Sequence, residues 1–330
     1  MKSKKLSIIK SFLVMTILGT FFITGCKKIE RSDELNIGYF NNITHSQALL
    51  MKSEGILEEK LGEDVSINWT AFNAGPMEVE ALLSGSIDIG FIGPVPALTA
   101  GSISEGEIKV LAGVSKGGSV LVKRKGTDIN SAADLAGKIV AVPQLGNTQH
   151  LCLLDILERA KLKTDTDGGN VAVVAISNAD VGNAMSRGDI DAAIVPEPWG
   201  ATLLENGAKL VLDYDEICYE GDYDVAVVVV RNSFLEHNPD IVRTFLDAHR
   251  QMTDELNSRK KECMQRVNNE INEATGKLLN DSVITDAYGR IGFYAEYNMA
   301  SMDLFLELIK KNEIVKKVPE EVNYYVNNFE

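Results

Sequence analysis

The chain has 330 residues, and 45% of them are apolar, which is enough for two domains that each bury a core. Its 33 basic and 47 acidic residues give a net charge of −14 at pH 7. This acidity argues against nucleic acid as a partner and against electrostatic binding to an anionic membrane.

The N-terminus predicts a lipoprotein signal peptide over residues 1–25. Four lysines within the first ten residues precede an apolar run from Ser11 to Ile23, which is too short to span a membrane comfortably. Ile23-Thr24-Gly25-Cys26 resembles a bacterial lipobox, in which the cysteine thiol receives diacylglycerol before it becomes the first residue. An uncleaved signal anchor is the alternative. Residues 26–34 are polar and predict a short tether between the lipid and the fold.

Strand-like and helix-like stretches then alternate, which is typical of an α/β sheet with mostly parallel strands. The predicted strands are Leu35–Tyr39, Val65–Thr70, Ile87–Ile92, Ile108–Val114, Lys138–Val142, Val171–Ile176, Asp191–Val195, Lys209–Asp213 and Asp224–Val230. The pattern restarts after Lys116-Gly117-Gly118, so we predict two α/β lobes, each with a mostly parallel sheet flanked by helices.

Two internal matches favour lobes of like architecture. The segment Ser84–Gly90 matches Arg187–Ala193, since in both a helix ends at glycine and Ile-Asp opens a buried strand. Asn42–His45 matches Gly146–Gln149 at nearly the same offset. We assign residues 118–222 to lobe 2, and residues 35–117 and 223–330 to lobe 1, because the amphipathic C-terminal helices have no sheet of their own.

Four strand-to-helix turns carry the candidate ligand-binding residues, because ligands of open parallel sheets bind beyond the carboxyl ends of the strands. Thr44 and Gln47 have the spacing of a capping box, and Pro76 and Pro94 stand at first helical positions. These turns contain no lysine or arginine, so helix N–H groups and neutral donors would hold an oxyanion or a polar neutral molecule. The alternative is that they only cap helices. The candidates are Thr44, His45, Asn73, Ala74, Gly75, Gly93, Pro94, Gly146, Asn147 and Thr148.

The segment Pro196-Glu197-Pro198-Trp199 adds two candidates, because its prolines stiffen a strand end and present Glu197 and Trp199 where the second lobe faces the crevice. Trp199 would line the site as an apolar wall or pack under its own helix. Glu197 would contact the ligand or make a hinge hydrogen bond.

No catalytic residue, cofactor or metal site is predicted. The sequence holds no His-Glu-x-x-His and no Gly-x-Ser-x-Gly motif. Cys152, Cys218 and Cys263 are far apart without Cys-x-x-Cys spacing, so we expect buried structural thiols.

Several of these motifs together resemble the substrate-binding proteins of the nitrate, taurine and aliphatic-sulfonate class of ABC importers. They are Gly38–His45, Phe72–Pro76, Ile87–Pro96, Pro143–Gln149 and Pro196–Trp199, and Asn41 stands where the family would have proline. The resemblance implies a two-lobe periplasmic-binding-protein-like (type II) fold. Together with the lipobox it predicts an extracytoplasmic, lipid-anchored protein, which we expect to be a monomer.

The same resemblance implies that the protein delivers a small oxyanion, preferably an aliphatic sulfonate or taurine, to an ABC transporter permease. Nitrate, bicarbonate and a pyrimidine or thiamine precursor stay open as ligands. An enzyme or a sensor domain with the same fold is the alternative from a different functional class of protein.

Overall fold

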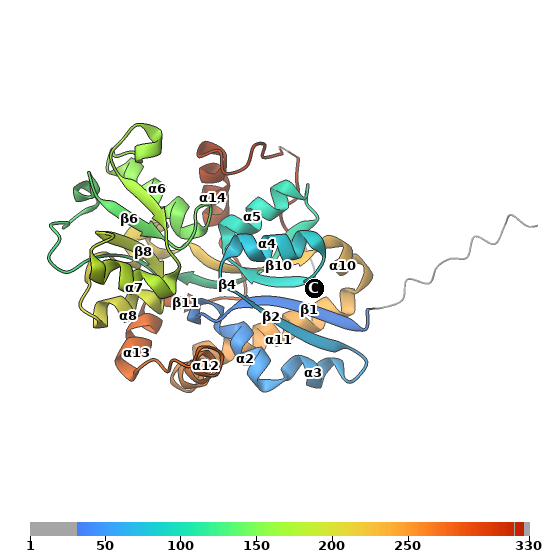
Figure 1. The fold of residues 1–330 in the computed structure, drawn as a ribbon. Helices are drawn as coiled ribbons and strands as arrows, with labels where there is room; N and C mark the ends of the chain where they lie inside the picture. The colour runs from blue at the N-terminus through green and yellow to red at the C-terminus, as the bar shows by residue number, and fades with distance from the viewer. Residues whose placement is uncertain (1–31, 320, 327–330) are drawn as a thin grey trace, which may run out of the picture. The chain divides into compact units, whose positions relative to one another are not determined.

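The computed structural model describes residues 32–319 and 321–326. Within these ranges the chain is an α/β protein with helices flanking two sheets, which confirms the predicted fold class (Figure 1). The predicted signal peptide, Cys26 and most of the tether lie outside the described residues. In the described ranges, no helix is both long and apolar enough to cross a membrane.

The first sheet has six strands in the order β11-β4-β10-β3-β1-β2, and the second has five in the order β7-β6-β8-β5-β9. The strands of the first sheet are β1 (Glu34–Phe40), β2 (Ser66–Phe72), β3 (Ile89–Ile92), β4 (Ile108–Gly117), β10 (Asp224–Arg231) and β11 (Ile291–Phe293). Those of the second are β5 (Ser119–Lys123), β6 (Ile139–Val142), β7 (Ala172–Ala175), β8 (Ala192–Pro196) and β9 (Lys209–Leu212).

The helices lie between and after these strands. They are α2 (Ser46–Glu54), α3 (Ile56–Leu61), α4 (Gly75–Ser84), α5 (Pro94–Ile103), α6 (Thr148–Arg159), α7 (Asn178–Arg187), α8 (Trp199–Glu205), α9 (Tyr214–Ile217), α10 (Asn232–His237), α11 (Pro239–Ser258), α12 (Lys260–Thr275), α13 (Asp281–Gly289) and α14 (Met299–Lys311). Short 3-10 helices are η1 (Ile43–His45), η2 (Ala132–Leu135), η3 (Asp165–Asp167) and η4 (Tyr219–Gly221).

Both sheets are mixed, whereas the sequence pattern predicts mostly parallel strands. β1 runs parallel to β2 and β3, and β6 runs parallel to β7 and β8. By contrast, β10 is antiparallel to β3 and β4, and β5 is antiparallel to β8 and β9. β5 and β10 are the strands that begin after the chain passes from one sheet to the other. Their direction follows from that crossing and not from a strand-helix-strand unit.

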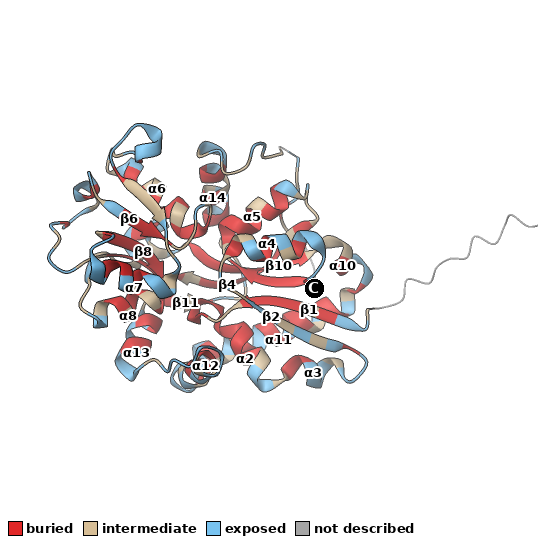
Figure 2. Cartoon of the chain, in the orientation of Figure 1, coloured by how far each residue is buried: buried red, intermediate tan, exposed pale blue. Residues whose placement is uncertain are grey.

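The valine run of β10 matches its central place in the first sheet. Residues 224–230 are all buried, as expected of a strand covered on both faces (Figure 2). β5 is equally apolar and lies between β8 and β9. It is missing from the predicted strands because it directly follows Gly117-Gly118, a pair that interrupts the strand-helix pattern. β11, with three residues, is also missing from them.

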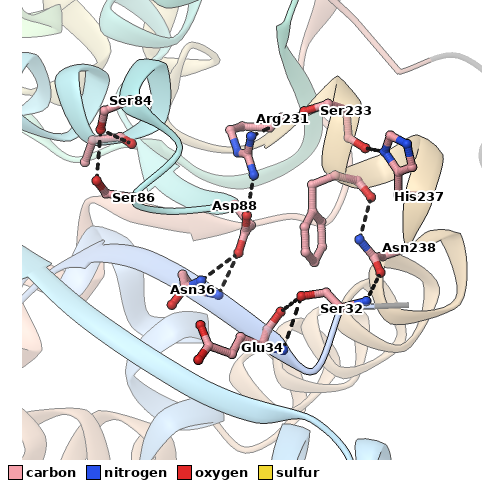
Figure 3. A network of polar contacts seen from close by, with 12 residues as sticks. Ser32, Glu34, Asn36, Ser84, Ser86, Asp88, Arg231, Ser233, His237 and Asn238 are labelled. Carbon is pink, nitrogen blue, oxygen red and sulfur yellow. Dashed lines mark hydrogen bonds and ion pairs between the residues drawn. The ribbon is translucent and has the colours of Figure 1, made fainter. Parts of the chain in front are cut away.

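Asp88, in the first of the matching segments, joins three strands of the first sheet. Its Oδ2 accepts hydrogen bonds from the backbone N–H and the side chain of Asn36 on β1, each at 3.0 Å. Its Oδ1 lies 2.7 Å from the guanidinium of Arg231 at the end of β10, and Figure 3 shows Asp88 between these two partners. The carboxylate therefore accepts from a backbone N–H of β1 and also pairs with a cation.

Asp191, the matching residue of the second half, likewise accepts from a backbone N–H and pairs with an arginine in the second sheet. Its Oδ2 accepts from the backbone N–H of Ile139 on β6 at 3.0 Å, and its Oδ1 lies 3.0 Å from Arg124 after β5. The sequence match thus corresponds to one polar arrangement built twice.

The C-terminal helices share core residues with the first sheet, and some of them also contact helices of the second. α11 and α12 pack on α2, and β11 joins β4, but α13 packs against α8 and α14 against both α5 and α6. One hydrophobic cluster contains Val227 and Val229 of the first sheet together with Val140 and Ile194 of the second. Since the sheets share core residues, the division into two lobes with the boundaries given above stays a prediction.

Candidate functional site

The β3-to-α5 turn and the β6-to-α6 turn meet directly. A side chain at Gly93 would begin 2.6 Å from Thr148 Oγ1, so the absence of a side chain permits the approach. Thr148 is buried, and its Oγ1 has no hydrogen-bond partner among the described residues. Pro94 and Thr148 are the first residues of α5 and α6. The structure therefore brings two helix N-termini together with an unused hydroxyl between them.

The turn before α6 is shaped by its own residues. The Asn147 side chain accepts a hydrogen bond from the His150 N–H at 2.8 Å, which caps the helix. Gly146 has a φ of +79°, and its N–H donates to His150 Nδ1 at 3.0 Å. Gly146 through its backbone conformation and Asn147 through its side-chain cap thus position Thr148 at the start of α6.

The turn before α4 packs on the same region. A side chain at Gly75 would begin 2.6 Å from Pro96 Cγ, so this turn contacts the first turn of α5. Ala74 is the N-cap residue of α4, and no side chain caps that helix. Asn73 is exposed. Gly75 and Gly93 are therefore brought near one another, and a contact of Asn73 with a ligand stays a prediction.

Thr44 and Gln47 do not form the predicted capping box. The Thr44 N–H donates to the Asn42 side chain at 3.0 Å, and the Thr44 carbonyl accepts from Ser115 Oγ at 2.8 Å. Gln47 Nε2 donates to the Val114 carbonyl at 2.8 Å. The Gln47 side chain therefore bonds to β4 and is not available to cap the start of its own helix. Thr44 is buried in η1.

His45 is a buried, neutral histidine. Its Nδ1 accepts from the Phe40 N–H at 3.2 Å, which places the ring proton on Nε2. The ring stacks on that of Phe40 with a centroid distance of 4.7 Å. Burial lowers the pKa of His45 to about 3. These contacts favour a structural residue or a neutral donor over a catalytic base.

Asn41 is a polar residue that is not among the candidates predicted from the sequence. Its Oδ1 is buried and has no hydrogen-bond partner in the part of the chain that the structure describes. It lies in the turn that contains Thr44. The signal in the sequence that could have pointed to Asn41 was an asparagine at a position where the family would have proline. An acceptor at this position would suit a ligand that carries a donor.

Glu197 is fully buried, and both of its carboxyl oxygens are engaged. Oε1 lies 3.0 Å from the guanidinium of Arg290, and Oε2 accepts from the Ala201 N–H at 2.8 Å. Arg290 also pairs with Asp213 at 2.8 Å and Asp286 at 2.6 Å. Burial raises the pKa of Glu197 to about 7, although the Ala201 amide and Arg290 favour the ionised form. These contacts favour the structural alternative for Glu197.

Trp199 begins α8 and is half-buried against the core of the second sheet, which includes Val120, Val195 and Leu203. This packing favours the alternative that Trp199 lies under its own helix. Within the described ranges, no group of three or more His, Cys, Asp or Glu residues could hold a metal ion.

Two mixed sheets with two crossings between them, and turns of both sheets that meet at helix N-termini, place the protein in the class with the periplasmic-binding-protein fold. The chain belongs to the NMT1-like family, whose family model matches residues 29–269.

The chain is similar to two curated proteins of Escherichia coli (strain K12). It is 34% identical to the taurine-binding periplasmic protein and 33% identical to a putative aliphatic sulfonates-binding protein, each over 182 residues. Each match spans 54% of this chain and 54% of the relative, so about half the length of each is covered. The resemblance to the nitrate, taurine and sulfonate class of binding proteins is thereby confirmed.

The solved structure of the alkanesulfonate-binding protein SsuA from Xanthomonas axonopodis pv. citri, bound to MOPS, has the same fold. It aligns with a TM-score of 0.74 and 21% sequence identity, and the alignment covers 89% of this chain and 96% of that one.

Proposed function

We propose that this protein is an extracytoplasmic, lipid-anchored solute-binding protein that delivers a small oxyanion to an ABC importer. The ligand is an aliphatic sulfonate or taurine, and the protein works as a monomer. One observation carries the proposal: the buried Thr148 hydroxyl, without a partner among the described residues, lies where the N-termini of α5 and α6 meet.

The chemistry of this place suits a monoanion. Helix N-termini offer free N–H groups and partial positive charge, and the Thr148 hydroxyl is an additional neutral donor. No lysine or arginine stands in the four turns, so the ligand is held without a cationic clamp and can be released to a permease. The names of the two Escherichia coli relatives support a sulfonate over other oxyanions.

Nitrate, bicarbonate and a pyrimidine or thiamine precursor are alternative ligands for the same carrier. A thermal-shift screen of these compounds against sulfonates and taurine separates them. A ligand present at about 100 times its dissociation constant raises the free energy of unfolding by about 2.7 kcal/mol. If only a neutral pyrimidine stabilises the protein, the proposal of an oxyanion ligand is wrong, while the proposed role as a carrier stands. An enzyme is the less favoured class, because His45 is buried and its Nδ1 is occupied.

Thr148→Ala and Thr44→Ala are each expected to weaken binding of the ligand found in the screen about ten- to a hundred-fold. Each change removes one buried donor to a charged group. Isothermal titration calorimetry measures the effect, with Thr166→Ala on the exposed surface of η3 as the matched control. If Thr148→Ala and Thr44→Ala bind the ligand as tightly as Thr166→Ala does, the site lies elsewhere.

Cys26→Ser is expected to abolish lipid attachment. The protein should then lack the diacylglycerol mass, and it should either leave the detergent phase in a Triton X-114 partition or keep its signal peptide as an unprocessed precursor. Cys263→Ser is the matched control, because that cysteine is buried in the core and should not alter partitioning. A Cys26→Ser protein that still partitions with detergent and has the wild-type mass would contradict the lipobox.

A further inference from the structure

Two of the three described cysteines are neighbours in the fold, although 66 positions separate them in the sequence. Cys152 lies in the middle of α6, and Cys218 directly follows α9. Their relative exposures are 0% and 3%, and both belong to one hydrophobic cluster. Helix α6 packs against α9, which places the two thiols next to each other. Cys263 belongs to a different cluster.

Contacts outside the thiols hold the two segments together. Arg159, in the last turn of α6, donates to the Ile217 carbonyl at 2.6 Å and to the Glu216 carbonyl at 3.4 Å. The same guanidinium pairs with Asp155 of α6 at 2.9 Å. Because residues 216 and 217 immediately precede Cys218, these bonds keep its backbone against the helix that carries Cys152.

The surroundings keep both thiols away from solvent. Tyr223 is also fully buried nearby, and its hydroxyl accepts from the Ser119 N–H at 3.2 Å. The neighbouring Cys218 thiol and burial raise the pKa of Cys152 well above its ordinary value. Since the thiolate is the reacting form, exchange is slow in the folded state and faster while the segments are still assembling.

We propose that Cys152 and Cys218 form an intrachain disulfide when the chain folds in the presence of a disulfide oxidant. One cysteine thiolate attacks the oxidant's S–S bond and gives a mixed disulfide. The second cysteine then displaces the remaining oxidant thiolate. Both cysteines are oxidised, the oxidant is reduced to two thiols, and the two cysteine protons end on them.

The disulfide would tie the segment that leads from the second sheet back to the first sheet to a helix of the second sheet. Cys218 lies between β9 of the second sheet and β10 of the first, and Cys152 lies on the helix that follows β6. The disulfide would therefore fix the start of one crossing without involving any of the candidate ligand-binding residues. This inference is independent of the ligand proposed above.

The test uses the full-length protein with Cys26→Ser, so that Cys152, Cys218 and Cys263 are its only cysteines. The protein is unfolded and reduced, then refolded in oxidised and reduced glutathione. It is next denatured, alkylated and examined by intact mass and peptide mapping. We expect a single alkylated cysteine, Cys263, and a linked pair of peptides containing Cys152 and Cys218. Reductant should lower the melting temperature by about 5 °C.

Matched variants separate the possible outcomes. With Cys263→Ser the disulfide should persist and no alkylatable thiol should remain. With Cys218→Ser, two thiols should be alkylated and reductant should leave the melting temperature unchanged. Three alkylated cysteines in the refolded parent, a bond to Cys263, or glutathione adducts in place of an intrachain bond would each overturn the proposal. If a variant fails to refold, the alkylation and peptide mapping of the parent protein alone test the proposal.

Discussion

Arg290→Gln is expected to lower the free energy of unfolding by about 3 kcal/mol at pH 8.5, because it leaves the buried Glu197 carboxylate without its cation. The loss should shrink to about 1 kcal/mol at pH 5.5, where Glu197 takes up a proton and only neutral hydrogen bonds and exposed pairs are lost. Urea unfolding at the two pH values, followed by circular dichroism, measures both numbers.

The sign follows from the pKa of Glu197, which burial raises to about 7 in the folded protein from an ordinary 4.5. Between these values the folded state holds a proton that the unfolded state has released. This group's contribution to stability is therefore present below pH 4.5 and is lost as the pH rises through about 7. Without Arg290 the folded pKa rises further, so the variant's deficit grows with pH.

Two controls test the assignment to the Arg290–Glu197 pair. Arg250→Gln removes an exposed arginine whose partner Asp247 is 3.5 Å away, and it should cost less than about 0.5 kcal/mol. Adding Glu197→Gln to Arg290→Gln should remove the extra pH dependence, because no buried carboxyl then remains to titrate. An Arg290→Gln deficit of the same size at both pH values would show that the pair does not act through the charge of Glu197.

Asp88→Ala is expected to cost about 3 kcal/mol of unfolding free energy. It removes the partner of Arg231, whose side chain is 24% exposed, and the acceptor for the Asn36 N–H. The matching change Asp191→Ala removes the same two contacts from the second sheet. Because the Asp191 and Arg124 side chains are 21% and 34% exposed, water replaces part of what is lost, and about 1 kcal/mol is expected.

Equilibrium denaturation in urea compares the two variants in the same protein. Asp88→Asn should fall between wild type and Asp88→Ala, because an amide oxygen can still accept from Asn36. If Asp191→Ala costs as much as Asp88→Ala, burial does not set the energy of these pairs, and the explanation by exposure is wrong.

The features predictable from the sequence were those with local signals. Strand-helix alternation predicts the α/β class, and the recurring Gly-x-Ile-Asp pattern marks Asp88 and Asp191, which prove to occupy matching places. The partners of these aspartates were not predictable. Arg231 and Arg124 are 143 and 67 residues away from them, and no local pattern specifies such pairs.

In the candidate site, too, features with local signals were predictable and contacts between distant residues were not. The glycine and proline positions of the turns predicted where α5 and α6 begin, and Gly93 and Thr148 do meet. The role of Gln47 was predicted wrongly, because a buried amide bonds more effectively to β4 than to its own helix start. The structural contacts of Glu197 depend on Arg290, 93 residues later, which only the folded chain brings to it.

The strand order has a consequence for how the chain folds as it is made. The second sheet consists of residues 119–212 alone and can assemble as soon as that segment is available. In the first sheet, β4 lies between β10 and β11, which are synthesised roughly a hundred residues or more after it. Until then both edges of β4 are unpaired, and open strand edges promote aggregation. A nascent chain that stops before residue 224 therefore carries a finished second sheet and an incomplete first one.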